Sequence, residues 1–408
     1  MSRRPFRFLH AADFHLELPP LGVTEVPEHL HDVFLECPYQ AAERVFQTAL
    51  AEQVEFLVLA GDLLDPLETG PRGPLFLQQW FRRLGEAEIA VYWAGGRVDP
   101  PEAWPACVGL PENVHVFPAG RPQAVVHQRE SAPLARLVGA SSPGEAGIRP
   151  EEFEGDPAGL FSIAVVHAAP EPEAIAGRPI QYWALGRRHN RWTWSAGAQA
   201  AHDPGSPQGR HPEETGPHGC TLVHVDDEGQ VRTSLVSTSV LRWESERLLV
   251  DEGTTPCDLE TRLRQRMEAL KESAGGADLL VSWTVAGHGP LVSRLRRGGA
   301  IEILAGLRRE FGVGPPVAWS VALAVEPAAV LPPEWYEQDS IRGEFLRTVR
   351  HYQINPAEPL GLDAYLPPGH SAALAGAAAP DDGSLRERVL HEAALLGADL
   401  LSGEEAQP

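Results

Sequence analysis

The chain has little cysteine and no long apolar run. Its four cysteines, Cys37, Cys107, Cys220 and Cys257, lie far apart in the sequence. Without a Cys-x-x-Cys pair, the sequence predicts neither a disulfide framework nor a cysteine zinc cluster, which is typical of the reducing cytoplasm. No run of roughly 18 or more apolar residues occurs, so we expect no membrane-spanning helix. The expected location is therefore cytoplasmic.

Positive charge is also scarce. The chain has 34 Lys and Arg against 56 Asp and Glu, which gives a formal net charge of −22. A domain that binds duplex DNA by itself normally has a basic surface, because phosphate contacts dominate affinity. Either a partner supplies the positive surface, or DNA is not the ligand. Ordinary solubility explains an acidic surface equally well.

Short apolar strands alternate with helical patterns through the first half of the 408 residues. This alternation predicts a layered α/β domain over residues 1–242. The expected strands cover 6–9, 56–60, 89–93, 162–166 and 182–185, and the expected helices cover 41–52 and 75–84.

The second half predicts a small α/β capping domain over residues 243–328 and a C-terminal helical segment over 329–352. Residues 353–383 are rich in Pro, Gly and Ala and predict a linker. A capping box then opens an amphipathic helix in the terminal segment 384–408. Because this helix follows a linker, we expect it to be dispensable for folding and free to dock.

Polar side chains with metal-ligand chemistry follow the apolar strands. Asp13 and His15 come directly after the first strand, and Asp62 follows the second. Residues i and i+2 of an extended segment point the same way, so Asp13 and His15 can share an ion. His167 and His189 end two further strands. Five nitrogen and oxygen ligands suit Mn²⁺, Fe²⁺ or Zn²⁺ better than calcium.

The order of these motifs resembles that of the calcineurin-like metallophosphoesterases, and most closely that of SbcD-type, YhaO-like DNA repair exonuclease subunits. The resemblance covers roughly residues 5–352. The motifs that carry it are HAADFH at 10–15, LAGDLLD at 59–65, YWALG at 182–186, the loop 204–219 and DSIRGEFL at 339–346.

The resemblance implies a central β-sandwich flanked by helices, with a divalent metal such as Mn²⁺ as cofactor. It also implies a first metal position formed by Asp13, His15, Asp62 and His189. The second position would use Asp62 as a bridge, together with His167, an Asn and a further His.

The resemblance also implies a homodimer that reaches DNA in a complex with an SbcC-like or YhaN-like coiled-coil ATPase. The helices at 339–352 and 384–401 would be the docking elements for this partner. Packing of both helices against the capping domain is the alternative.

The sequence departs from the family at the second metal position. The motif Gly-Asn-His-Asp reads Gly-Arg-Val-Asp at residues 96–99, and Gly-His-x-His reads Gly-Arg-Arg-His at 186–189. Arg97 and Arg187 thus replace two ligands, and Val98 replaces the histidine that assists cleavage. Arginine offers no lone pair to a cation, although it can bind phosphate. We expect Arg187 to point into the site and Arg97 and Arg187 to be candidate phosphate contacts.

Arg210, in the loop after the last ligand, is a candidate DNA contact by resemblance. With one position intact, we expect one ion per chain and impaired exonuclease activity. Three functions stay open: a weakened Mn²⁺-dependent DNA phosphodiesterase, a non-catalytic architectural subunit of a DNA-processing ATPase complex, and a small-molecule phosphatase. The replaced ligands favour architecture, and the four retained ligands favour an enzyme.

Overall fold

The computed structural model describes residues 4–142, 148–327, 331–365 and 383–401. The chain divides into two compact units. Unit 1 comprises Met1–Ser245, Lys271–Val281 and Gly314–Val321, and unit 2 comprises Glu246–Leu270, Ser282–Val313 and Ala322–Pro408. In the described part of the chain, no helix combines the length and apolar character needed to cross a bilayer.

Unit 1 contains two six-stranded sheets. The first has the order β12 (Val231–Ser237), β11 (Gly219–Val225), β1 (Phe6–Ala11), β2 (Phe56–Leu59), β3 (Ala90–Ala94) and β4 (Val114–Phe117). The second has the order β5 (Gln123–Arg129), β6 (Ala132–Ala140), β7 (Phe161–His167), β8 (Tyr182–Gly186), β10 (Gln199–Asp203) and β9 (Trp192–Ala196).

Alternating side chains explain how the sheets stack. In β2, Phe56 and Val58 join the core shared by the two sheets, whereas Leu57 and Leu59 join the core under the helices. In β7, Val165 faces the shared core and its neighbours face the opposite side. Because every second residue of a strand points the same way, continuous apolar strands are buried on both faces.

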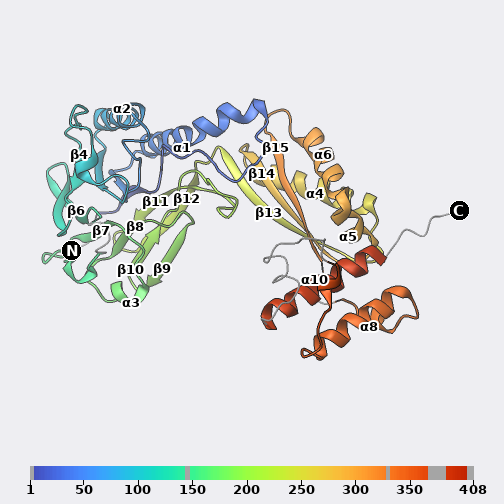
Figure 1. The fold of residues 1–408 in the computed structure, drawn as a ribbon. Coiled ribbons are helices and arrows are strands. Elements are labelled where there is room, and N and C mark those ends of the chain that lie inside the picture. The colour runs from blue at the N-terminus through green and yellow to red at the C-terminus, as the bar shows by residue number, and fades with distance from the viewer. Residues whose placement is uncertain (1–3, 143–147, 328–330, 366–382, 402–408) are drawn as a thin grey trace. The chain divides into compact units, whose positions relative to one another are not determined.

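Helices cover the outer faces of both sheets (Figure 1). The long helix α1 (His31–Ala51) and α2 (Arg72–Glu86) pack on the first sheet, and the short α3 (Pro172–Ile175) packs on the second. This arrangement confirms the layered α/β fold expected from the sequence. The central strand pairs β1–β2, β2–β3, β6–β7 and β7–β8 are parallel, so their carboxyl ends lie at the same edge of each sheet.

The sequence pattern underestimated α1. Its first turns, from His31 onward, lie before the predicted start at residue 41, and Pro38 lies inside the helix. Because proline usually ends a helix, the sequence did not predict helix before Pro38. Burial of Phe34 and Cys37 stabilises these turns against the apolar residues around them. Strands β4, β5 and β6 were not predicted at all.

Unit 2 contains most of the helices of the second half. The three-stranded sheet β13–β14–β15 has residues in both units. The elements are β13 (Leu241–Val250), α4 (Pro256–Ser273), β14 (Asp278–Gly287), α5 (Pro290–Arg294), η5 (Leu295–Gly299), α6 (Ala300–Phe311) and β15 (Ala318–Pro327). Unit 2 begins at Glu246, but unit 1 also includes Lys271–Val281 and Gly314–Val321, so the expected capping range 243–328 is divided between the units.

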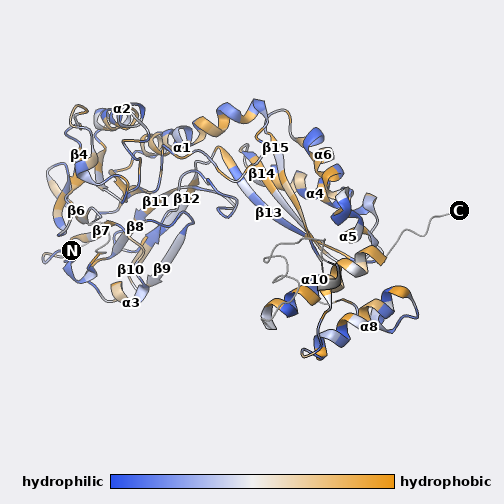
Figure 2. Cartoon of the chain, in the orientation of Figure 1, coloured by the Kyte–Doolittle hydropathy of each residue, from blue (hydrophilic) through white to orange (hydrophobic). Residues whose placement is uncertain are grey.

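The last helix packs against its neighbours. The elements after β15 are α7 (Pro333–Glu337), α8 (Ile341–Ile354), η6 (Leu362–Tyr365) and α10 (Gly383–Leu401). Leu390 and Leu395 of α10 are buried against Leu346 and Val349 of α8, and both helices carry hydrophobic and hydrophilic residues (Figure 2). The expectation that α10 is free to dock is therefore wrong, because its apolar face completes a core; its dispensability for folding stays a prediction. Residues 366–382 of the expected linker lie outside the described residues.

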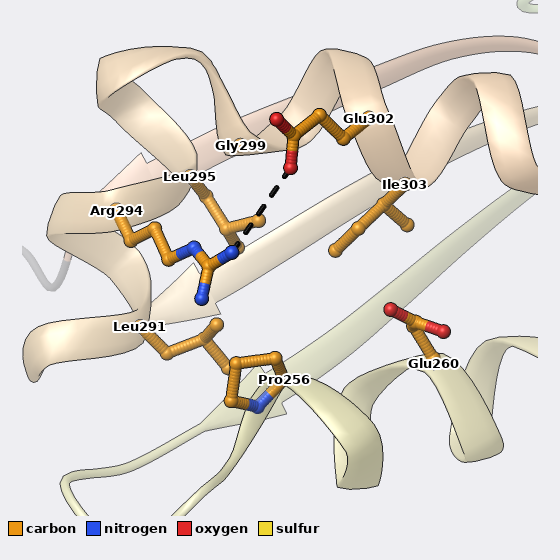
Figure 3. Close-up of a pocket in the computed structure, with 8 residues that line it drawn as sticks. All are labelled: Pro256, Glu260, Leu291, Arg294, Leu295, Gly299, Glu302 and Ile303. Atoms are coloured by element: carbon orange, nitrogen blue, oxygen red, sulfur yellow. Dashed lines mark ion pairs between the residues drawn. The ribbon is translucent and has the colours of Figure 1, made fainter.

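A small hollow of about 80 Å³ lies between α4 and the α5–α6 segment of unit 2 (Figure 3). Its lining combines Leu291, Leu295 and Ile303 with charged groups, and Arg294 forms an ion pair with Glu302 at 4.0 Å. The hollow gathers no cluster of metal ligands or catalytic groups among the residues described around it.

Candidate metal centre

Three of the site residues, Asp13, His15 and Asp62, lie on two loops that follow β1 and β2, whereas His167 ends β7 and His189 follows β8. Asp13, His15 and Asp62 have positive φ angles of 55°, 44° and 51°. Such angles are uncommon for residues other than glycine and gather at functional sites. Backbone hydrogen bonds join the loops, from the amide of Asp13 to Gly61 O (2.9 Å) and from the amide of His15 to Asp62 O (3.1 Å). The two carboxylates are thus held at one edge of the sheet.

Gly96 permits the next loop to approach. A Cβ atom on Gly96 would lie 2.3 Å from Oδ1 of Asp62 and 2.5 Å from its backbone nitrogen. No side chain tolerates such distances, so the loop after β3 reaches Asp62 only because residue 96 is glycine.

The five predicted ligands come together in two overlapping clusters. Asp13, His15 and His189 form one, and Asp13, Asp62 and His167 form the other, each with ligand atoms within 4.8 Å of one another. Nε2 of His167 lies 3.2 Å from Oδ1 of Asp13 and 3.3 Å from Oδ2 of Asp62. Of the four ligands predicted for the first position, Asp13, His15 and His189 share one cluster, and Asp62 lies in the other. Nε2 of His15 lies 3.7 Å from Oδ2 of Asp62.

The residues present fit a metal ion. Nε2 of His15 is buried and has no hydrogen-bond partner among the described residues. Its Nδ1 atom lies 3.1 Å from Oε1 of Glu17. Since a carboxylate only accepts hydrogen bonds, in the neutral ring Nδ1 carries the hydrogen and Nε2 presents a lone pair to the site. A buried lone pair beside two carboxylates is what a divalent cation requires.

Backbone amides occupy one oxygen of each carboxylate, and the other oxygen of each faces His167. Oδ1 of Asp62 accepts from the amides of Arg97 (2.6 Å) and Val98 (3.0 Å). Oδ2 of Asp13 accepts from the amide of Arg187 at 2.8 Å. The side chains of Arg97 and Arg187 are exposed. These residues therefore contact the predicted ligands through their backbones, and the expected direction of the Arg187 side chain stays a prediction.

Asp99 organises the same loops from behind. Its carboxylate accepts hydrogen bonds from the amides of Asp62 (2.9 Å), Leu63 (2.9 Å) and Gly96 (2.5 Å). The residue is 2% exposed. Burial raises the pKa of its carboxyl to about 7, and the nearby Asp62 charge adds to this rise against the amide hydrogen bonds. Asp99 is a structural support of the site rather than a ligand.

Sequence reasoning missed several further buried groups. Glu214 lies 2.7 Å from Nδ1 of His189. Burial opposes ionisation of Glu214, but hydrogen bonds from His189 and the Arg210 amide outweigh it and lower its pKa to about 2. Asp203, at the end of β10, accepts from the amides of Arg188 and Gly205, and burial raises its pKa well above the usual range. No spacing pattern in the sequence marks these residues, because their partners are distant or in loops.

Arg210 is more buried than a typical DNA contact. It is 6% exposed, and burial lowers the pKa of its guanidinium against the attraction of nearby carboxylates. Nη2 of Arg210 lies 3.2 Å from Nε2 and 3.3 Å from Nδ1 of His189. Nη2 of Arg210 is thus within hydrogen-bonding distance of both ring nitrogens of His189, and a metal ion bound at Nε2 would have to displace this contact.

No protein-family model matches the chain. The chain is 27% identical over 331 residues to the uncharacterized metallophosphoesterase YhaO of Bacillus subtilis (strain 168), which covers 78% of this chain and 80% of YhaO. A dimetal phosphatase from Danio rerio is 10% identical, with a TM-score of 0.35, and covers 57% of this chain and 99% of that structure. Vps29 from Entamoeba histolytica complexed with Zn²⁺ is 12% identical, with a TM-score of 0.25 and the same coverages.

At these TM-scores the structural likeness carries no argument, and the assignment depends on sequence and site. The relation to YhaO extends over most of both chains. The ligand types expected of a metal-dependent hydrolase follow the strands in the expected order and meet at one edge of the fold. By these criteria the chain is similar to metallophosphoesterases over most of its length.

Proposed function

We propose that unit 1 binds one divalent ion per chain, Mn²⁺, through Asp13, His15, Asp62 and His189. The observation that carries this proposal is the small ligand set left at the second position. His167 faces Oδ1 of Asp13 and Oδ2 of Asp62, while the other oxygen of each carboxylate accepts hydrogen bonds from the amides of Arg187 and Arg97. Arg97 and Arg187 offer no ligand atom that would complete this position.

We further propose that phosphodiester hydrolysis is weakened or lost. In a two-metal hydrolase the ions supply a clamp that stabilises both the attacking and the leaving oxygens. Val98, where the family has an assisting histidine, neither donates nor accepts a proton. Removal of one group that stabilises a transition state commonly costs roughly 10²- to 10³-fold in rate, and several are replaced here.

The substrate class that we propose is DNA, by resemblance to SbcD-type, YhaO-like repair exonuclease subunits. In this proposal the chain acts as a homodimer within a complex with an SbcC-like or YhaN-like ATPase. The net charge of −22 supports dependence on a partner, since an acidic chain attracts phosphate poorly by itself. The same charge, together with the lost ligands, favours a second candidate, which is a non-catalytic architectural subunit of that complex.

A nuclease assay with Mn²⁺ tests the catalytic part. We expect little or no hydrolysis of linear DNA by the isolated chain. The triple variant Arg97→Asn, Val98→His and Arg187→His should recover part of the activity, and no single change should suffice, because these groups act as a unit.

The control variant Arg82→Asn with Arg232→His removes the same number of guanidinium groups at exposed positions on α2 and β12. It should leave activity at the level of the unaltered chain. Robust activity of the unaltered chain that Asp62→Ala abolishes would contradict the proposed loss. It would show that one ion with the present side chains is sufficient.

A further inference from the structure

Two buried glutamates lie behind the two histidines of the first metal position. Oε1 of Glu17 lies 3.1 Å from Nδ1 of His15, and Oε1 of Glu214 lies 2.7 Å from Nδ1 of His189. The glutamate side chains are 5% and 10% exposed. Both histidines therefore have a carboxylate partner on the ring nitrogen that faces away from the site.

Each carboxylate is itself held by a backbone amide. Oε2 of Glu17 accepts from the amide of Asp65 at 2.9 Å. Oε2 of Glu214 accepts from the amide of Arg210 at 2.7 Å. With one oxygen on a histidine and the other on the backbone, neither glutamate can rotate without breaking a hydrogen bond that is at least partly buried. Breaking such a bond costs more than breaking one in full contact with water.

This arrangement determines which ring nitrogen carries the hydrogen. A carboxylate accepts but does not donate, so the neutral imidazole places its hydrogen on Nδ1 and leaves a lone pair on Nε2. The orphaned Nε2 of His15 is that lone pair. His167 in the other cluster differs. Its Nε2 faces Asp13 and Asp62, and no carboxylate lies within hydrogen-bonding distance of its Nδ1 among the described residues.

We propose that Glu17 and Glu214 are positioning residues that preset His15 and His189 in the Nδ1–H tautomer and so direct a divalent ion to the first position. The proposal rests on the metal site proposed above, but not on any hydrolytic activity. Carboxylate partners of ligand histidines fix ring orientation and raise ligand basicity, and their loss typically weakens metal affinity roughly 10- to 100-fold. The ion therefore gains from both glutamates without contacting either.

Titration of the full chain with Mn²⁺ by calorimetry tests the proposal. Glu17→Ala and Glu214→Ala should each raise the dissociation constant for Mn²⁺ roughly 10- to 100-fold. Glutamine has one acceptor oxygen for two donors, so Glu17→Gln and Glu214→Gln should give intermediate values and serve where an alanine variant folds poorly. Glu55→Ala is the matched control, because Glu55 pairs with His127 away from the metal centre and its loss should leave the constant unchanged.

Imidazole ¹⁵N spectra of the metal-free chain give a readout that a purely structural role would not change. His15 and His189 should show the Nδ1–H tautomer, and each should lose it only in the variant of its own glutamate. Folded variants with unaltered tautomers and unaltered Mn²⁺ affinity would overturn the positioning role alone. Absence of Mn²⁺ binding by the unaltered chain would instead overturn the proposed metal site, and the positioning role with it.

Discussion

Substitution of Asp99 tests whether the loop at residues 96–99 still holds Asp62 in place. Oδ1 of Asp99 accepts from the amides of Asp62 and Gly96, and Oδ2 accepts from the amide of Leu63. Asp99→Asn keeps Oδ1 but points an NH₂ group at the Leu63 amide, so one buried donor loses its acceptor. Asp99→Ala removes the acceptors of all three amides.

The magnitudes follow from the cost of an unsatisfied buried donor, about 1–3 kcal/mol each. Asp99→Asn should lower the free energy of unfolding by about 1–3 kcal/mol. Asp99→Ala should cost roughly 3 kcal/mol or more, although the three losses share one loop and are not additive. Because Asp62 moves with this loop, Mn²⁺ affinity should fall in the same order.

Thermal or urea unfolding of the metal-free chain measures these differences. The control is Asp226→Ala, which removes the acceptor of two amides, those of Glu228 and Gln230, in an exposed turn. Water replaces the lost acceptor there, so the change should be less than about 1 kcal/mol. An Asp99→Ala chain as stable as the unaltered protein would refute the reasoning, since the three amides would then need no buried acceptor.

Three further changes probe other parts of the molecule. Leu395→Ala should lower the free energy of unfolding by about 2–5 kcal/mol, whereas Leu396→Ala, at a 53% exposed position of α10, should change little; equal effects would contradict the packing of α10. Burial lowers the pKa of His202 from 6.5 to about 2, so its contribution to stability is full above roughly pH 6.5 and is lost as the pH falls, when the unfolded chain takes up the proton. His202→Asn should therefore reduce the loss of stability between roughly pH 7 and pH 5 by about 2 kcal/mol in urea titrations, and an unchanged slope would argue against a buried neutral imidazole. Gly96→Ala should abolish Mn²⁺ binding in calorimetry while the chain stays folded, because the new Cβ would collide with Asp62, and normal binding would show that the loops can separate.

The place where the candidate ligands meet could be predicted from the sequence because each of them follows an apolar strand. Asp13 and Asp62 come after β1 and β2, and the carboxyl ends of parallel neighbours meet at one sheet edge. An apolar strand pattern with a polar residue at its end therefore predicts where a candidate ligand lies. The same logic found His167 at the end of β7.

The supporting residues could not be found in this way. Glu17 reaches the amide of Asp65, 48 residues away, and Asp99 reaches that of Leu63, 36 residues away, across irregular loops. Loop conformation has no periodic signature, so nothing in the sequence pairs these groups. The packing of α10 on α8 was missed for a related reason, because an amphipathic helix shows that it has an apolar face but not which surface covers it.

In the Gly-Arg-Val-Asp segment, the two residues that support the loop are retained, and the two that would take part in chemistry are replaced. Gly96 and Asp99 occupy the positions that the loop needs in order to approach and hold Asp62. Arg97 and Val98 occupy the positions where the family has a ligand and an assisting histidine, and they donate only backbone hydrogen bonds to Asp62. The scaffold of the site is thus intact on the side where its chemical groups are replaced.

The number of ions per chain tests the central claim most directly. After saturation with Mn²⁺ and removal of free ions, elemental analysis of the full chain should give about one ion per chain, and Asp13→Ala should give none, since Asp13 belongs to both clusters. The triple variant Arg97→Asn, Val98→His and Arg187→His should approach two. Two tightly held ions in the unaltered chain would contradict the account, because the second position would then bind an ion without the ligands that Arg97 and Arg187 replace.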